Sequence, residues 1–465
     1  MNSVFLILDF ALKFCILIFK FLIMSIIARV MDVTQAGYSK ALDMKGVEYI
    51  VPFGCPGDTV EVDVKGHGRN KKGIITKIIE PSSDRVEPKC SYAGKDGKVW
   101  KKCGGCAFQY ISYEKQLKLK RDLIKSAFLK KDVLAEVKEV LLSPQIFGYR
   151  NRMDFIVGPN KEIGLREKGS FEKIIDIEKC ELVSSRMNEV LASVRKWIKE
   201  SPVSAWNYAS GEGILRYIIL REMPGTHELA VIFITYKEYL DNYISDLRKY
   251  LPSFVTHIFN GLQDSVADIS FGNKYRSYLG GEYLSAKIKD IFYLVSPGSF
   301  FQTNSSCAEL MLGQVLKWVS EVKPKNVLDL YCGGGFFSLA ISKMAGEVCG
   351  VELDKSAIDL AIRTAEYNKI KNVKFVSGDV LDFDISFGNY DLLVVDPPRV
   401  GLHPKVISRL MEAKIPNLIY VSCNFDSLAY NLSVLGDAYE IEEVQPIDMF
   451  PHTPHVETLV KLRRK

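Results

Sequence analysis

The strongest constraint on the fold is the regular alternation of strand-like and helix-like segments from about residue 298 to the end of the chain. Five apolar runs are separated by segments of helical length, namely NVLDLYC, EVCGVEL, NVKFVSG, YDLLVVDPP and NLIYVSC. Such runs are typical of parallel strands that are buried on both faces and joined by helices. The sequence therefore predicts a doubly wound, Rossmann-like α/β domain in the C-terminal part.

A glycine-rich turn follows the first of these strands, where such sheets bind nucleotide-like ligands. Gly333, Gly334 and Gly335 let the chain reverse and let a ligand approach the backbone amides. The turn lacks both the GxGxxG spacing and the GK[ST] of a P-loop. Glu352 and Asp379 end the next two strands, where an acid can hold a ribose diol, although each singly is more often a helix N-cap. This pattern favours S-adenosylmethionine over NAD.

Three further side chains are candidates for chemistry near the strand ends. Asp396, followed by two prolines, ends the fourth strand and Cys423 ends the fifth, so both are expected to face the ligand crevice. A cysteine that ends a strand is usually a buried thiol, but the ligand-facing position favours a nucleophile. Glu457 lies in an otherwise apolar strand, where a carboxylate is either paired or acts as a base.

The N-terminal residues 1–31 are mostly apolar but are interrupted by charges. Asp9, Lys13, Lys20 and Arg29 leave no uncharged run close to the ~18 residues that a spanning helix needs. A signal peptide is disfavoured because no basic segment precedes the apolar stretch. We interpret this stretch as an extension from a misplaced start codon, with an interfacial amphipathic helix as the alternative.

Residues 32–88 contain short β-type runs broken by glycine, which predict a small OB-like β-barrel. Basic residues are frequent around its third strand: Lys65, Arg69, Lys71, Lys72 and Lys77. Lysines commonly protect a solvated strand edge. The alternative is a barrel that binds nucleic acid.

The positive charge is concentrated in residues 89–131. This segment holds twelve Lys or Arg and three acidic residues, whereas the net charge of the whole chain is only +5. Aromatic residues are interleaved with the basic ones, as suits phosphate contacts and base stacking. Together with the barrel, the segment predicts RNA as a partner.

Four of the ten cysteines are candidates for a metal centre. Cys103 and Cys106 form CGGC, whose glycines allow both thiolates to point at one ion or cluster. Cys90 and Cys180 complete a set that fits either structural zinc or a [4Fe–4S] cluster, and the spacing alone does not separate the two. So few cysteines in so long a chain form no disulfide framework, and we expect a reducing, cytoplasmic location.

The chain resembles the TRAM-domain, iron–sulfur-containing family of RNA uracil-5-methyltransferases, typified by the 23S ribosomal RNA enzymes. The resemblance covers nearly all of residues 34–465. It is carried, in order, by CGGCAFQ, YRNRMDF, SPGSFFQTN, DLYCGGG, DPPRVGL, YVSCN and DMFPHTPHVE.

The resemblance implies a domain division and a set of site residues. It places a TRAM barrel at 32–88, a central iron–sulfur α+β domain at 89–115 and 179–295, and a catalytic domain at 116–178 and 296–465. It makes Cys423 the nucleophile and Glu457 the base. The implied ligands of a [4Fe–4S] cluster are Cys90, Cys103, Cys106 and Cys180. The implied residues that hold S-adenosylmethionine are Gln302, Tyr331, Glu352, Asp379 and Asp396.

The implied activity is methylation of uracil C5 in RNA by S-adenosylmethionine, through a covalent bond between the cysteine and C6. The resemblance favours 23S ribosomal RNA over transfer RNA, and we expect a monomer without stable membrane association. Two other classes remain open. A DPP loop also occurs in enzymes that methylate exocyclic amino groups, and an iron–sulfur RNA-binding protein without activity would share the N-terminal features.

Overall fold

The computed structural model describes residues 24–65, 71–93, 103–385 and 389–465 of the chain. It divides into two compact units. Unit 1 comprises Met1–Gln116, Glu167–Ser170 and His452–Pro454, and unit 2 comprises Leu117–Arg166, Phe171–Pro451 and His455–Lys465. In the described part of the chain, no helix is both long and apolar enough to cross a membrane.

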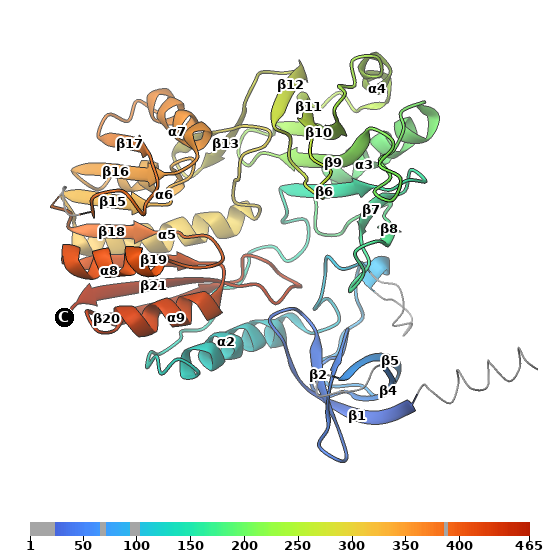
Figure 1. Cartoon of the computed structure of the whole chain (residues 1–465), viewed down its shortest axis with the longest axis horizontal. Helices are drawn as coiled ribbons and strands as arrows, with labels where there is room; N and C mark the ends of the chain where they lie inside the picture. The colour runs from blue at the N-terminus through green and yellow to red at the C-terminus, as the bar shows by residue number, and fades with distance from the viewer. Residues whose placement is uncertain (1–23, 66–70, 94–102, 386–388) are drawn as a thin grey trace, which may run out of the picture. The chain divides into compact units, whose positions relative to one another are not determined.

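Unit 1 contains the predicted barrel (Figure 1). Its strands are β1 (Met24–Val33), β2 (Ser39–Asp43), β3 (Glu48–Val51), β4 (Thr59–Lys65) and β5 (Lys71–Glu80). They close in the order β1-β2-β3-β5-β4. Alternate residues such as Ala28 and Val30 of β1 and Val60 and Val62 of β4 fill the interior, as the pleat of a strand requires.

The barrel begins earlier than the sequence pattern predicts. The predicted boundary between residues 31 and 32 falls inside β1, which pairs with both β2 and β4. The assignment of residues 24–31 to an N-terminal extension is therefore wrong, because an apolar run was treated as one segment although its second part alternates between the barrel interior and its surface. Residues 1–23, the rest of that extension, lie outside the described residues.

Unit 2 contains a central, mostly antiparallel sheet in the order β12-β11-β10-β9-β6-β7-β8. Its strands are β6 (Arg152–Val157), β7 (Ile163–Arg166), β8 (Ile174–Asp176), β9 (Leu215–Glu222), β10 (Leu229–Tyr236), β11 (His257–Gln263) and β12 (Lys274–Leu279). The helices α3 (Ser185–Glu200) and α4 (Ile244–Tyr250) accompany it. β9 and β10 are buried along almost their whole length, so they form the middle of this layer.

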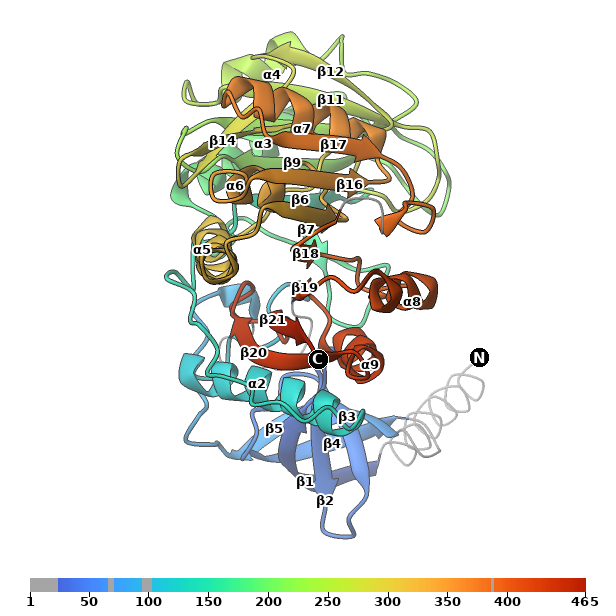
Figure 2. The same ribbon diagram turned by 90° about the vertical axis from the view of Figure 1, so that its left-hand side faces the viewer.

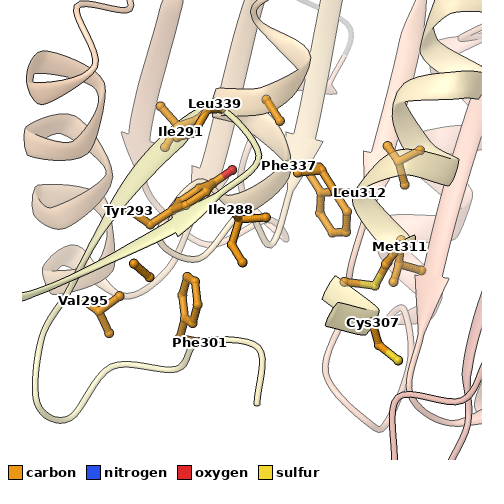
Figure 3. Close-up of a cluster of buried hydrophobic side chains, with 14 of the residues drawn as sticks. Ile288, Ile291, Tyr293, Val295, Phe301, Cys307, Met311, Leu312, Phe337 and Leu339 are labelled. Carbon is orange, nitrogen blue, oxygen red and sulfur yellow. The ribbon is translucent and has the colours of Figure 1, made fainter. Parts of the chain in front are cut away.

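The predicted domain boundaries need correction here. The catalytic domain was predicted to include residues 116–178, but β6, β7 and β8 belong to the central sheet because β6 pairs with β9. The hairpin of β13 (Leu284–Ile288) and β14 (Ile291–Val295) was assigned to the central domain. Its apolar side chains join a cluster that holds central-sheet residues such as Ile219 and Ile232 and also residues of α5 (Ser305–Val322) and α6 (Phe336–Ile341), so the hairpin packs against both parts (Figure 3).

The C-terminal sheet has the order β17-β16-β15-β18-β19-β21-β20. Its strands are β15 (Asn326–Leu330), β16 (Glu347–Glu352), β17 (Val373–Ser377), β18 (Leu392–Val395), β19 (Asn417–Ser422), β20 (Tyr439–Ile447) and β21 (Glu457–Arg464). The first five are parallel, and β21 and β20 are antiparallel additions at one edge. The predicted doubly wound α/β domain is confirmed.

Helices cover both faces of this sheet (Figure 2). Val327 of β15 packs into one apolar cluster with α5, α6 and α7 (Lys355–Tyr367), whereas its neighbour Leu328 packs into a second cluster. The second cluster contains residues of α8 (Pro404–Ala413), α9 (Phe425–Leu435) and α2 (Tyr113–Leu129). Successive residues of each strand face opposite layers, which explains the continuous apolar runs.

The strand order reverses between β15 and β18, because the chain proceeds outward from β15 through β16 to β17 and then returns to β18. In open α/β sheets the ligand crevice lies beyond the carboxyl ends of the strands at such a reversal. The glycine-rich turn follows β15, and Asp396 follows β18.

Candidate active site

The turn after β15 leaves its backbone open to a ligand. Tyr331, Gly333 and Gly335 adopt positive φ angles of 63°, 51° and 80°. A Cβ built on Gly333 or Gly334 would meet no heavy atom within 4 Å, so the space beside these peptides is empty of protein. The turn therefore offers a backbone surface that a cofactor can approach closely.

The acids predicted at the strand ends lie around this turn. Glu352 accepts a hydrogen bond from the backbone N–H of Gly333 (3.2 Å) and one from that of Asp354 (3.0 Å). Asp379 accepts one from the backbone N–H of Leu381 (2.9 Å). Burial raises the pKa of Tyr331, and the negative charges of Asp379 and Glu352 raise it further. The structure thus brings Tyr331, Glu352 and Asp379 together.

Gln302 is held by a residue of the YRNRMDF segment. The Asn151 side-chain amide donates to the Gln302 carbonyl (2.9 Å) and to Ser305 Oγ (2.8 Å), and the Asn151 N–H donates to the Thr303 carbonyl (2.9 Å). The YRNRMDF segment carries part of the family resemblance, but no sequence pattern predicts a role for Asn151. Only the fold shows that a residue preceding β6 fixes the loop before α5.

Cys423 and Glu457 come from neighbouring strands. β19 and β21 pair in antiparallel register, with Tyr420 opposite Val460 and Ser422 opposite Thr458. Continuing this register by one residue sets Cys423 opposite Glu457 at the carboxyl end of β19. Glu457 is only 7% exposed, whereas Cys423 is half-buried. The two residues predicted as nucleophile and base therefore lie near each other at this end of the strands, where the charge of Glu457 acts on Cys423.

Burial and neighbouring acids determine the protonation of these groups. Burial, followed by the charges of Glu457 and Asp396, raises the pKa of Cys423 to about 11. Burial and the nearby Asp396 raise the pKa of Glu457 well above its ordinary value. Burial, together with Asp329, raises the pKa of Asp396 to about 7. Cys423 is consequently a thiol at neutral pH in the protein alone.

Arg399 is the cation that opposes these shifts. Its guanidinium lowers the pKa of both Cys423 and Glu457. Its carbonyl accepts hydrogen bonds from Asn424 Nδ2 (2.8 Å) and Ser427 Oγ (3.0 Å), which tie the DPPR loop to the segment after Cys423. The sequence offered one signal for this role, which is the position of Arg399 three residues after Asp396.

Several residues of the basic segment have structural partners. Lys120 of α2 is completely buried and pairs with Asp448. Arg121 pairs with Glu139 and donates to the carbonyl of Val137 (2.8 Å). The local positive charge therefore overstates the number of cations in this segment that are available to RNA.

The four predicted cluster cysteines are divided between the units. Cys90, Cys103 and Cys106 belong to unit 1, where the Gly105 N–H donates to Cys103 Sγ (3.4 Å), and Cys180 belongs to unit 2. Among the described residues, no group of three or more His, Cys, Asp or Glu is arranged to hold a metal ion. The described residues therefore do not support the predicted four-cysteine centre.

Comparison with known proteins identifies the family. The family model described as tRNA (Uracil-5-)-methyltransferase matches residues 112–465. The chain is 38% identical to a tRNA (uracil(54)-C(5))-methyltransferase of Pyrococcus horikoshii, over 89% of this chain and 95% of that protein. It is 37% identical to a 23S rRNA (uracil(747)-C(5))-methyltransferase of the same organism, over 90% and 95% of the two chains.

A solved structure extends the match to the fold. The crystal structure of Pyrococcus abyssi tRNA (uracil-54, C5)-methyltransferase in complex with S-adenosyl-L-homocysteine is 32% identical to this chain. It aligns with a TM-score of 0.77 over 94% of this chain and 100% of that one. These matches exclude the two alternatives that the sequence left open, an enzyme that methylates exocyclic amino groups and an RNA-binding protein without activity. The chain belongs to the tRNA (uracil-5-)-methyltransferase family and is an RNA uracil-C5 methyltransferase.

Proposed function

We propose that the chain methylates C5 of a uridine in transfer RNA through a temporary covalent bond between Cys423 and C6 of the base. The observation that carries this proposal is the ladder of β19 and β21, whose last pair, Ser422 and Thr458, directly precedes Cys423 in one strand and directly follows Glu457 in the other. Uracil C5 is a poor nucleophile, and addition of a thiolate to C6 activates it. The reaction therefore needs a nucleophile and a base in one crevice.

The proposed steps balance in electrons and protons. The Cys423 thiolate adds to C6, and the electron pair of the C5=C6 bond becomes available at C5. C5 would take up the methyl group of S-adenosylmethionine, and the electron pair of the broken S–CH3 bond would stay on sulfur in the leaving S-adenosylhomocysteine. Glu457 then removes the C5 proton, the C–H electron pair restores the C5=C6 bond, and the Cys423 thiolate leaves.

The residues around the glycine turn fit the cofactor. We propose that Gln302, Tyr331, Glu352, Asp379 and Asp396 hold S-adenosylmethionine. The open backbone beside Gly333 and Gly334 and the nearby acids suit a ribose and an adenine that bind at strand ends. The target uridine must leave its stack to reach Cys423, as bases do in enzymes that act on them.

Substitution of Cys423 tests the nucleophile. RNA that contains 5-fluorouridine has no C5 proton to lose, so the covalent intermediate accumulates on the wild-type protein. We expect Cys423→Ala to form no such adduct, as judged by a denaturing gel. An adduct of wild-type amount in this variant would contradict the assignment.

Substitution of Glu457 tests the base. With ordinary RNA, Glu457→Gln should transfer the methyl group and then remain bound to the product, because no carboxylate removes the C5 proton. The expected observation is a denaturation-resistant complex that carries a labelled methyl group. Full turnover by Glu457→Gln would remove this residue from the mechanism.

The relatives support transfer RNA as the first substrate to test. Relatives from three Pyrococcus species are named as methyltransferases of tRNA uracil 54, whereas one is named as a methyltransferase of 23S rRNA uracil 747. We therefore propose transfer RNA in place of the ribosomal RNA that the sequence favoured. Purified protein should methylate a tRNA transcript and not its U54C counterpart; methylation of only a 23S fragment would instead favour ribosomal RNA.

We also propose that the barrel is a TRAM domain that binds RNA. A second proposal is that the four cysteines Cys90, Cys103, Cys106 and Cys180 hold a [4Fe–4S] cluster. The closed five-stranded barrel and the exposed Lys72 and Lys77 support the first. The CGGC spacing supports the second. Anaerobic purification followed by iron and acid-labile sulfide assays tests the cluster, with zinc as the alternative result.

A further inference from the structure

The position of Glu457 depends on both ends of one loop. Glu457 is the first residue of β21, and Ile447, the last residue of β20, is its partner in the ladder. Residues 448–456, here called the base loop, connect the two strands. Asp448 directly follows Ile447 in the chain. A displacement of Asp448 therefore also displaces Ile447, which is the partner of Glu457.

A buried ion pair holds the start of the base loop. Lys120 Nζ contacts the Asp448 carboxylate, and both side chains are 0% exposed. Lys120 also donates to the carbonyl of Phe450 (3.0 Å). Among the described residues, the second oxygen of Asp448 has no hydrogen-bond partner. Lysine is rarely buried so completely, and here it is the cation that compensates the carboxylate.

Other contacts hold the same loop. Asn304 Nδ2 donates to the carbonyl of Met449 (3.1 Å), and Tyr149 Oη donates to that of Pro451 (3.1 Å). The ring of Phe450 lies edge-on to His455, with 6.2 Å between ring centroids, and His455 precedes Glu457 by two residues. Asn304 also lies two residues after Gln302 in the chain, so the loop that is proposed to hold the cofactor contacts the base loop.

We propose that Lys120 is a positioning residue for Glu457: by pairing with Asp448 and binding the Phe450 carbonyl, it fixes the base loop so that the carboxylate stays opposite Cys423. The inference rests on the proposed function, in which Glu457 is the base. An apolar side chain at position 120 would fill the same space at no cost in desolvation. We therefore attribute the buried charge of Lys120 to its contacts with Asp448 and Phe450 and not to packing.

The test separates the two halves of the reaction. Formation of the covalent adduct requires Cys423, whereas its release requires Glu457. In Lys120→Met, adduct formation should stay within about threefold of wild type, while release from ordinary tRNA slows about tenfold or more, as expected when a general base is misplaced. The variant would thus accumulate a methylated, denaturation-resistant complex, as Glu457→Gln does.

Two further variants separate positioning from stability. Lys120→Met/Asp448→Asn removes the unpaired buried carboxylate, so its melting temperature should exceed that of Lys120→Met, but the lost Phe450 contact keeps release slow. Tyr149→Phe removes only the hydroxyl that donates to Pro451 and should slow release about two- to fivefold. Lys138→Met breaks a half-exposed pair with Glu443 (2.8 Å) on β20 and serves as the matched control with wild-type release.

The outcomes decide between the explanations. Slow release with near-normal adduct formation in Lys120→Met and in the double variant supports the inference. Wild-type release in the double variant, or an equal loss of both steps, overturns it. If Lys120→Met does not fold, the rate at which the double variant and Tyr149→Phe release the RNA adduct decides whether the inference holds. Failure of the wild-type protein to form an adduct with 5-fluorouridine RNA would instead refute the proposed function on which the inference rests.

Discussion

Replacement of Arg399 by Gln should shift the ionisation of Cys423 to higher pH. Burial and the charges of Glu457 and Asp396 raise the pKa of Cys423 to about 11, and Arg399 is the cation that opposes them. Below its pKa a thiol loses about tenfold in thiolate fraction for each pH unit, so near pH 8 only about one Cys423 in 10³ is ionised. Loss of Arg399 should lower this fraction further.

The expected size of the shift is modest because Arg399 is exposed and solvent screens its charge. We expect about threefold less thiolate at a given pH in Arg399→Gln. Glu457→Gln should have the opposite effect, because it removes a charge that raises the pKa of Cys423. Arg463→Gln, at the far end of β21, is the matched control and should leave Cys423 unchanged.

Alkylation measures this ionisation in the protein without RNA. The protein is treated briefly with iodoacetamide at a series of pH values, and mass spectrometry quantifies the peptide that contains Cys423. The alkylation rate should rise about tenfold per pH unit from pH 7 to 9. A midpoint near the ordinary thiol value of about 8.5, or shifts of the same sign in Arg399→Gln and Glu457→Gln, would refute the electrostatic reasoning.

Three other substitutions test the cofactor turn and the buried acid beneath it. Gly334→Ala should unfold like wild type, because its Cβ would meet no atom within 4 Å. It should bind S-adenosylmethionine about tenfold more weakly by calorimetry, and unchanged affinity would remove the turn from the cofactor site. Gly335→Ala should lower the free energy of unfolding in urea by about 1–2 kcal/mol or more, because its φ is +80° and the added Cβ would lie 2.8 Å from the Phe375 ring. Burial raises the pKa of Asp329 to about 7, so the folded state retains a proton that the unfolded state releases above about pH 4. The contribution of this bound proton to the free energy of unfolding is fully present below about pH 4 and is lost as the pH rises towards 7. Asp329→Asn should therefore melt at a higher temperature relative to wild type at pH 8 than at pH 5, and a larger relative gain at pH 5 would contradict the raised pKa.

Local patterns were sufficient for much of the catalytic sheet. The runs around Val327, Leu392 and Leu418 are mostly apolar because each strand faces an apolar layer on both sides, and this property is visible in the sequence. A strand-end position was sufficient to select Asp396 and Cys423 as crevice residues. The predicted start of the barrel at residue 32 was wrong because a strand of a small barrel and an apolar extension have similar composition.

Contacts between distant residues were outside the reach of these patterns. Asn151 holds Gln302 across 151 positions of sequence, and Lys120 pairs with Asp448 across 328. The basic segment that predicts RNA as a partner includes Lys120, because charge in a sequence carries no information about burial. The assignment of β6 to the central sheet likewise depends on its pairing with β9, and pairing is a property of the folded chain.

The sequence by itself determined the doubly wound sheet, the glycine turn and the chemical types available at the strand ends, because strand periodicity and glycine geometry act over a few residues. Only the tertiary structure decided that Cys423 and Glu457 lie near each other, that the charge of Arg399 opposes the acids around them, and that Lys120 pairs with Asp448. Ladder register and desolvation couple residues that are far apart in the chain, so the protonation and position of the proposed catalytic groups exist only once the sheet has formed.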